Sequence, residues 1–255
     1  MKIAMPADLA DFYKSAAQQA RVVTEAWGEE NLFCPACNSE SLTRSAHNRE
    51  AIDFACPQCL ELFQLKSRST PIGGKIMDAA YGAMHRAIVS GQTPNLFALH
   101  YDRAQWQVLN LIVIPRFAYS LSAIEKRKPL AATARRANWV GCNILLGNIP
   151  PDARITIMKC GVATDAGVVR RQFTRLRPLE KIKQDARGWP PDVLNVVRGL
   201  NREEFSLQDV YAFAGHLQTL HPSNWHVRDK IRQQLQVLRD LGFVEFLGQS
   251  RYRSL

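Results

Sequence analysis

The sequence predicts an α/β (α+β) core of residues 1–182 that carries a zinc-binding insertion, followed by a small domain of residues 183–255. Three observations predict this arrangement. Strand-like and helix-like segments are mixed in the first part of the chain, and two cysteine pairs lie between residues 34 and 59. The C-terminal part contains three helical segments and a β-hairpin. Hydrophobic residues make up 46% of the 255 residues, which is enough for packed cores.

Hydrophobic periodicity places the elements of the first domain. Apolar residues recur at three- and four-residue steps from Leu9 to Trp27, which predicts an amphipathic helix that Gly28 ends. A second helix is expected from Met77 to Val89. Apolar and β-branched runs predict strands over residues 62–66, 96–101, 108–114 and 154–158. A proline-rich, charged stretch at 178–191 indicates the domain boundary.

The two cysteine pairs predict a zinc site. Each CxxC turn presents two thiolates, so the two turns together complete a tetrahedral site with no open position, which indicates a structural metal. The alternative is two unrelated pairs. We expect the other two cysteines, Cys142 and Cys160, to be buried as small hydrophobic residues. The predicted zinc ligands are Cys34, Cys37, Cys56 and Cys59.

The second cysteine pair is flanked by polar residues that can converge on one pocket. Asp53 precedes the pair, and Gln64 and Lys66 follow it, so the pair lies at the tip of a hairpin. Alternate side chains of a strand share a face, which places Gln64 and Lys66 on one side while Phe63 and Leu65 face the core. The alternative is a solvated strand face.

This group of residues suits phosphodiester hydrolysis. Asp53, the Gln64 side-chain oxygen and the Leu65 carbonyl are oxygen ligands of the kind that Mg²⁺ prefers. A bound metal polarises a phosphate and activates water, and Lys66 would orient that water and stabilise the developing charge. Glu25 is a further candidate acid, although helical projection places it opposite the apolar stripe.

The C-terminal segment has the order helix, helix, helix, hairpin. The first helix runs from Pro190 to about Leu200, Ser206 starts the second with a capping box, and Asn224 is expected to cap the third, which Gly242 ends. A hairpin over residues 243–253 completes a winged helix-turn-helix. The alternative is a small helical packing or dimerisation domain.

Several basic and aromatic residues are candidates for binding DNA, a partner that the net charge of +10 favours. Residues 126–136 contain five basic residues and no acidic residue, and Trp139, which could instead be a core residue, offers an apolar surface for a methyl group. We expect Trp225 either to contact a modified base or to pack beneath its helix. The candidates are Arg127, Arg135, Arg136, Trp139, Asn224, Trp225, Arg228, Arg232 and, on the wing with Arg253, Arg251.

Five segments resemble the DpnI family of restriction endonucleases, in order and nearly from end to end: TEAWGEENLFCPAC, DFACPQCLELFQLKS, RKPLAATARRANWVGCNI, RGWPPDVLN and IRQQLQVLRDLGFVEFLGQSRYRSL. The resemblance implies a PD-(D/E)xK nuclease core with a Cys₄ zinc site and a winged helix. It also implies a type II enzyme that uses Mg²⁺ to cleave GATC sites whose adenines carry an N6-methyl group, with no partner methyltransferase.

The resemblance implies that Asp53 is the family's metal-binding aspartate and that Lys66 is the lysine of the family's catalytic motif. Gln64 departs from it, because DpnI-like enzymes have Glu there, which predicts weaker Mg²⁺ binding or a preference for Mn²⁺. Related Mrr-type nucleases resemble the QxK form. Two alternatives stay open: a methyl-DNA-binding protein with weak or no nuclease activity, and a less specific Mrr-like nuclease.

No apolar run is long enough to span a membrane, and the N-terminus resembles no secretory signal. We therefore expect a cytoplasmic protein that is a monomer in solution.

Overall fold

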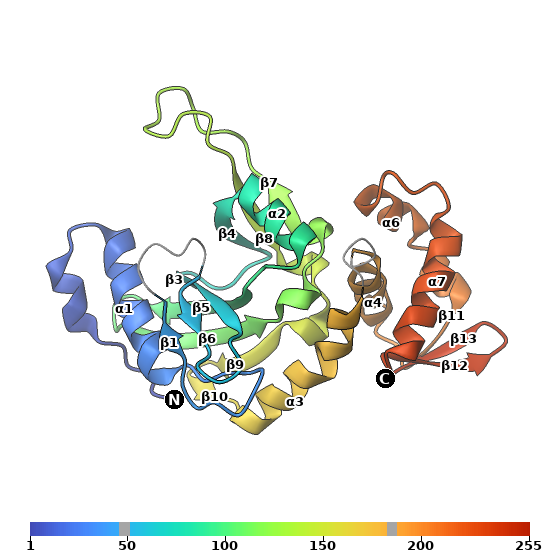
Figure 1. Ribbon diagram of the computed structural model, residues 1–255, viewed down its shortest axis with the longest axis horizontal. Coiled ribbons are helices and arrows are strands. Elements are labelled where there is room, and N and C mark those ends of the chain that lie inside the picture. Colours follow the sequence, from blue (N-terminus) through green and yellow to red (C-terminus); the bar gives the residue numbers. More distant parts are fainter. Residues whose placement is uncertain (46–51, 183–187) are drawn as a thin grey trace. The chain divides into compact units, whose positions relative to one another are not determined.

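The computed structural model describes residues 1–45, 52–182 and 188–255 (Figure 1). These residues form two compact units, each assembled from separate stretches of the chain. The first unit consists of residues 1–79, 92–116 and 152–176, and the second consists of residues 80–91, 117–151 and 177–255. The boundary expected between residues 182 and 183 adjoins residues 183–187, which lie outside the described part of the chain.

A seven-stranded sheet forms the centre of the first unit, in the order β1-β2-β3-β5-β6-β9-β10. β3 and β5 are parallel, whereas the other neighbouring strands are antiparallel. The four predicted strands are confirmed. The strands of this sheet are β1 (Thr43–Arg44), β2 (Phe54–Ala55), β3 (Leu62–Arg68), β5 (Asn95–Asp102), β6 (Gln107–Ile114), β9 (Ile155–Lys159) and β10 (Val162–Ala163).

Helix α1 (Ala16–Asn31) packs on this sheet beside β3. Thr24 on α1 donates a hydrogen bond from Oγ1 to Ser67 Oγ at 3.1 Å, and Gly28 lies directly against the ring of Phe54. Helix α3 (Ala166–Leu176) packs against β9 through Val169 and Phe173. The sheet and these helices position the β2–β3 hairpin, which carries the predicted catalytic residues.

Two predicted helices begin later than the periodicity indicated. The segment before α1 is a 3₁₀ helix, η1 (Ala7–Phe12), and Phe12 is 79% exposed, because extended backbone at Tyr13 and Ser15 separates the two elements. The stretch from Met77 begins as strand β4 (Lys75–Ala80), in which Ile76 and Asp78 are buried, and helix α2 (Tyr81–Ser90) follows. Alternating burial along β4 overrides the helical spacing that was expected there.

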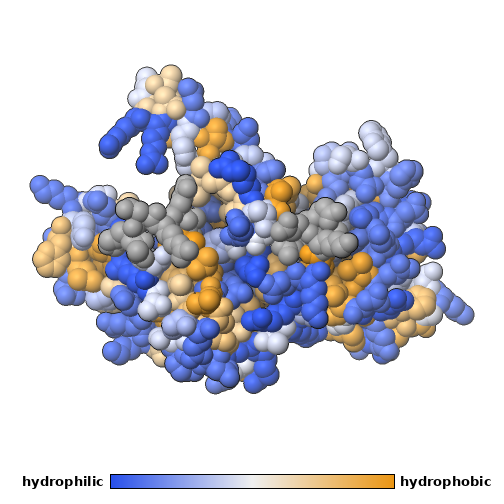
Figure 2. Space-filling model, in the orientation of Figure 1, coloured by the Kyte–Doolittle hydropathy of each residue, from blue (hydrophilic) through white to orange (hydrophobic). Residues whose placement is uncertain are grey.

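In the second unit, β7 (Ile124–Lys126) pairs antiparallel with β8 (Gly141–Leu145). The long loop of residues 127–140 connects them and extends away from the pair (Figure 1). Strongly hydrophilic side chains along this loop alternate with paler and more hydrophobic ones (Figure 2). Short 3₁₀ helices complete the connections: η2 (Arg116–Ala118), η3 (Leu121–Ala123), η4 (Leu146–Asn148), η5 (Pro151–Ala153) and η6 (Arg177–Lys181).

The C-terminal part of the second unit contains the expected hairpin and the expected first and third helices, whereas the expected second helix is divided into two. Its helices are α4 (Trp189–Gly199), α5 (Leu207–Tyr211), α6 (Ala214–Leu220) and α7 (Val227–Asp240). The strands β11 (Glu204–Ser206), β12 (Val244–Gly248) and β13 (Arg251–Ser254) form a sheet in the order β11-β13-β12. The capping box of Ser206 and Asp209 is confirmed, and Gly242 follows the end of α7 with a φ of 78°.

Two local expectations, for Asn224 and for Cys160, are wrong, and one strand was not expected. Asn224 does not cap α7: the N-cap is His226, and Asn224 Oδ1 accepts a hydrogen bond from the His226 amide at 2.9 Å in a turn that precedes the helix. β11 was not expected, because its three residues are too few for an alternating pattern to show. Cys142 is buried as expected, whereas Cys160 is exposed, since it lies in the turn between β9 and β10 with a φ of 49°.

Candidate active site

The four cysteines of the predicted zinc site come together in the first unit. All four Sγ atoms lie within 4.8 Å of one another, with Cys34 3.6 Å from Cys59 and Cys37 3.5 Å from Cys56. Each short contact joins one cysteine from each CxxC turn, so the two turns face each other across a common centre. Four thiols in this arrangement could bind a structural metal such as zinc.

The thiols differ in how readily they lose a proton. Burial alone raises the pKa of Cys56, but hydrogen bonds from the backbone of Cys59 and Gln58, with those of neighbouring thiols, lower its pKa to about 6. Burial raises the pKa of Cys59 to about 11 and raises the pKa of Cys34 further. Without a cation the site therefore disfavours four thiolates, which is what a dication would compensate.

Arg170 on α3 holds the first CxxC turn in place. Its guanidinium donates to the carbonyl oxygens of Cys34 at 3.2 Å and Ser39 at 3.0 Å, and it lies 5.2 Å from the centre of the Phe33 ring. Glu40 accepts a further hydrogen bond from Arg170. Sequence reasoning missed this residue, because nothing in the local pattern of α3 connects it to a turn 130 residues earlier.

The β2–β3 hairpin presents Asp53 next to the strand that carries Gln64 and Lys66. The Asp53 amide donates to the Phe63 carbonyl at 2.9 Å, and Phe54 is paired with Phe63. Asp53 thus also lies opposite Phe63, immediately before the regular pairing of β2 with β3 begins. The Leu65 amide donates to Asp53 Oδ2 at 2.7 Å. The Asp53 carboxylate therefore lies beside the stretch of β3 that carries Gln64 and Lys66, two residues that strand alternation places on one face.

That face is more enclosed than a half-solvated strand. Gln64 is only 5% exposed, and Lys66 is half-buried. Phe63 is fully buried and stacks on Phe97 with ring centres 5.1 Å apart, but Leu65 is half-buried rather than part of the core. Lys66 Nζ lies 2.8 Å from Oδ1 of Asp78, a buried residue of β4 that sequence reasoning did not single out.

The environment of Asp53 disfavours its charged form. Burial raises the pKa of the Asp53 carboxyl above its ordinary value of 3.8, and the negative charge of Glu25 adds to the rise. The hydrogen bond from Leu65 and the positive charges of Lys66 and Arg21 act in the opposite direction. An ionised Asp53 is thus a desolvated carboxylate that a bound cation would stabilise.

Glu25 lies closer to this site than helical projection indicated. Its side chain is buried on α1, with an ion pair to Arg21 at 3.3 Å and another to Arg44 of β1. Arg21 and Arg44 thus lie beside Glu25, at the end of the sheet where Asp53 lies. The projection failed because the edge strands β1 and β2 cover the part of α1 that the apolar stripe leaves free.

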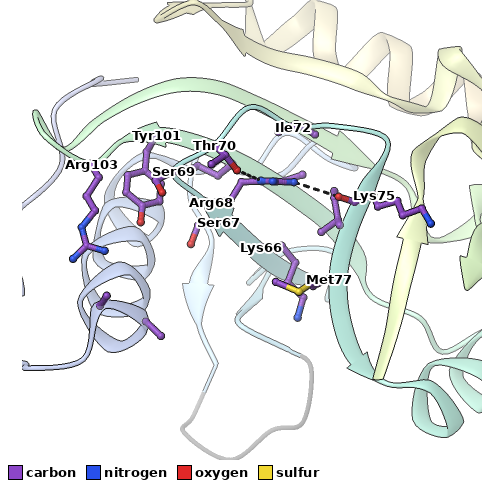
Figure 3. A pocket seen from close by; sticks show the side chains of 15 residues that line it. Lys66, Ser67, Arg68, Ser69, Thr70, Ile72, Lys75, Met77, Tyr101 and Arg103 are labelled. Atoms are coloured by element: carbon purple, nitrogen blue, oxygen red, sulfur yellow. Dashed lines mark hydrogen bonds between the residues drawn. The ribbon is translucent and has the colours of Figure 1, made fainter. Parts of the chain in front are cut away.

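A pocket of about 540 Å³ opens beside Lys66, at the end of β3 (Figure 3). Basic side chains line it, and Arg68 donates to Thr70 Oγ1 at 2.8 Å and to the Lys75 carbonyl at 3.3 Å. The basic lining residues are Lys66, Arg68, Lys75 and Arg103, with Tyr101 and Met77 between them. Such a lining favours an anionic ligand at this end of the strand.

The predicted DNA-binding residues of the loop 127–140 differ in their exposure. Arg135 and Arg136 are exposed, whereas Arg127 and Trp139 are half-buried. The Trp139 ring covers Gly141 so closely that a Cβ there would meet ring atoms at 2.8 Å. Trp139 is therefore packed on its own hairpin and is still partly accessible. Its environment lies between the two that were expected, a core residue and an exposed apolar surface.

The residues expected on the third helix and the wing lie at the surface. Trp225 is 85% exposed, so it does not pack beneath the helix start, and Arg232 is exposed. Arg228 lies 5.3 Å from the centre of the Tyr211 ring. Arg251 forms an ion pair with Glu204 of β11 at 2.8 Å, so a strand that sequence reasoning missed partly neutralises the wing.

A family model described as DpnI, the Dam-replacing family, matches residues 1–182, and a second, described as the Dam-replacing HTH domain, matches residues 185–254. The chain belongs to the Dam-replacing family. This membership makes it a methyl-dependent restriction enzyme with a C-terminal DNA-binding domain, as the sequence resemblance implied. Among the described residues, no helix has the length and apolar character that a membrane crossing requires.

Proposed function

We propose that this member of the Dam-replacing family is a type II endonuclease that hydrolyses DNA at GATC sites carrying N6-methyladenine. We further propose a PD-(D/E)xK catalytic domain of residues 1–182 and a winged-helix domain of residues 183–255. One observation carries the catalytic part: the desolvated Asp53 carboxylate accepts a hydrogen bond from the Leu65 amide, between Gln64 and Lys66, and the positive charge of Lys66 acts on it.

The residues around Asp53 suit Mg²⁺ or Mn²⁺. Asp53 Oδ2 accepts a hydrogen bond from the Leu65 amide, which leaves Oδ1 for a cation, and Gln64, the residue before Leu65, offers a side-chain oxygen. The amide and carbonyl of a strand residue point to the same side, so the Leu65 carbonyl is directed toward Asp53 as well. When bound there, the metal would supply charge neutralisation at the phosphate and activation of water.

Each side chain has a separate part in the proposed reaction. Asp53, Gln64 and the Leu65 carbonyl hold the cation, and Gln64 does so without adding a negative charge. The Lys66 ammonium stabilises the charge that develops on the phosphate and orients the attacking water. The neutral Gln64 lowers the affinity for Mg²⁺ relative to a carboxylate, so the enzyme needs a higher metal concentration.

Two groups of residues are proposed to bind the DNA. Arg127, Arg135 and Arg136 contact phosphates beside Trp139, which touches the methyl group from the loop 127–140. In the winged helix, Trp225 is exposed and can reach the modified base, with support from Asn224, Arg228, Arg232 and, on the wing, Arg251. We propose that the enzyme acts as a cytoplasmic monomer.

Matched plasmids with and without adenine methylation at GATC test this function. The protein is incubated with each plasmid over a range of Mg²⁺ and Mn²⁺ concentrations, and cleavage is followed by electrophoresis. We expect cutting of the methylated plasmid alone. Lys66→Met should abolish cutting, while the matched variant at the exposed Lys159, Lys159→Met, should cut normally.

The same experiment decides between the proposal and two alternatives. The buried, neutral Gln64 favours a methyl-DNA-binding protein without nuclease activity, which would retain the methylated plasmid in a binding assay and leave it intact. Cutting of both plasmids would instead indicate a less specific, Mrr-like nuclease. Either result refutes the proposed methyl-directed cleavage.

A further inference from the structure

Asp78 is a buried carboxylate that, within the described part of the chain, forms its ion pair with the proposed catalytic lysine. Its side chain is 1% exposed, and its Oδ1 atom lies 2.8 Å from Lys66 Nζ. Neither carboxylate oxygen has a hydrogen-bond partner among the described residues, so the ion pair with Lys66 is the interaction that compensates its burial. The Lys66 side chain is 27% exposed and lines the pocket in Figure 3, so the ion pair joins a buried carboxylate to an ammonium at the edge of this pocket.

This arrangement is a poor way to stabilise a fold. A buried carboxylate loses its hydration, and a single cation without supporting hydrogen bonds seldom repays that loss. Ile76, the neighbour of Asp78 on the same face of β4, is apolar and buried, and an apolar residue at position 78 would continue that face. The carboxylate at this position therefore calls for an explanation beyond packing.

The effect of Asp78 on the position of Lys66 supplies this explanation. A lysine ammonium is a point charge on a flexible four-carbon stem, so it needs an external contact to keep a fixed position. The positive charge of Lys66 also acts on Asp53, whose pKa it lowers, so Lys66 lies under the influence of two carboxylates. Gln64, two residues earlier on β3, has no charge with which to hold the ammonium.

We propose that Asp78 is a positioning residue for Lys66. It holds Nζ at the edge of the pocket, and it contacts neither the phosphate nor the metal. This inference rests on the proposed cleavage function, in which Lys66 is the group that acts on the phosphate. In this chain Asp78 takes over part of the electrostatic role that a carboxylate at position 64 would have.

Kinetics separate a positioning role from a metal-binding or structural role. We compare Asp78→Asn and Asp78→Glu with wild type and with the matched control at an exposed aspartate, Asp8→Asn, using methylated plasmid. We expect Asp78→Asn to lower kcat by about 10-fold to 100-fold, with KM and the Mg²⁺ requirement changed by less than about twofold. Asp78→Glu should recover part of the loss because it keeps the charge.

Chemical labelling of lysines tests the contact without any cleavage. Acetic anhydride modifies accessible, neutral amines, and mass spectrometry gives the extent at Lys66 relative to the exposed Lys159. Removal of the carboxylate takes away the contact that holds Nζ and leaves the amine more accessible, so Lys66 labelling should rise severalfold in Asp78→Asn and stay unchanged in Asp8→Asn. If Asp78→Asn unfolds below the assay temperature, the double variant Asp78→Asn/Lys66→Met should regain stability.

The outcomes are distinct. Unchanged kcat and unchanged Lys66 labelling in folded Asp78→Asn would overturn the inference, as would a large shift in the Mg²⁺ requirement, which would make Asp78 a metal ligand. A double variant that stays unfolded would show a purely structural role. If the wild type cuts no plasmid, the proposed function fails by itself, and the labelling still shows whether Asp78 holds Lys66.

Discussion

The substitution Gly28→Ala, which adds one methyl group to α1, tests whether this helix sets the position of the catalytic hairpin. A Cβ at position 28 would meet Phe54 Cζ at 2.8 Å and Leu32 Cδ1 at 3.1 Å, and Phe54 is fully buried. In an open helix, Gly→Ala stabilises by about 1 kcal/mol. Forcing a methyl against a rigid buried ring costs about 1–3 kcal/mol. Gly28→Ala should therefore destabilise the protein by about 1 kcal/mol, which is a fall in Tm of about 2–4 °C.

Thermal unfolding followed by circular dichroism measures this change. Gly82→Ala is the control, because that helical glycine meets nothing closer than the flexible end of Arg86 at 3.4 Å, so this variant should be slightly stabilised. Phe54 is the neighbour of Asp53, so its displacement should also lower the cleavage rate by about tenfold. Equal stabilisation of the two variants would refute the reasoning that α1 fixes the hairpin by contact.

Three further changes test the site. Asp53→Asn should abolish cleavage and yet raise Tm at pH 7 without divalent metal, because burial raises the pKa of Asp53 in the folded state. Protonation of Asp53 stabilises the folded wild type fully below about pH 3.8, and this stabilisation is lost as the pH rises through the raised folded-state pKa. The Tm difference between Asp53→Asn and wild type should therefore shrink on acidification from pH 7. A difference that does not shrink would contradict this reasoning. Gln64→Glu should lower the Mg²⁺ concentration for half-maximal cleavage by about tenfold and raise the pKa of Asp53 further; an unchanged metal titration would argue against Gln64 as a ligand. Trp225→Ala should reduce the preference for methylated over unmethylated duplex by about tenfold while leaving Tm unchanged, and equal preference before and after the substitution would exclude it as a methyl contact.

The sequence alone predicted those features that are determined by interactions between residues close together in the chain. Four ligands in two CxxC turns carry their own geometry, so the zinc cluster needed no knowledge of the fold. The apolar run of β6 and the capping box of Ser206 are equally local. For the same reason, strand alternation alone places Gln64 and Lys66 on one face of β3.

Tertiary structure decided which other side chains meet these residues. Asp78 reaches Lys66 from β4, a strand whose residues also fit the helical spacing expected there. Glu25 is buried because β1 brings Arg44 over a helix face that projection left in solvent. Arg170 contacts a cysteine turn from the far end of the first unit's sequence. Periodicity records which way a side chain points along its own element, whereas its partner depends on long-range packing, which leaves no local pattern in the chain.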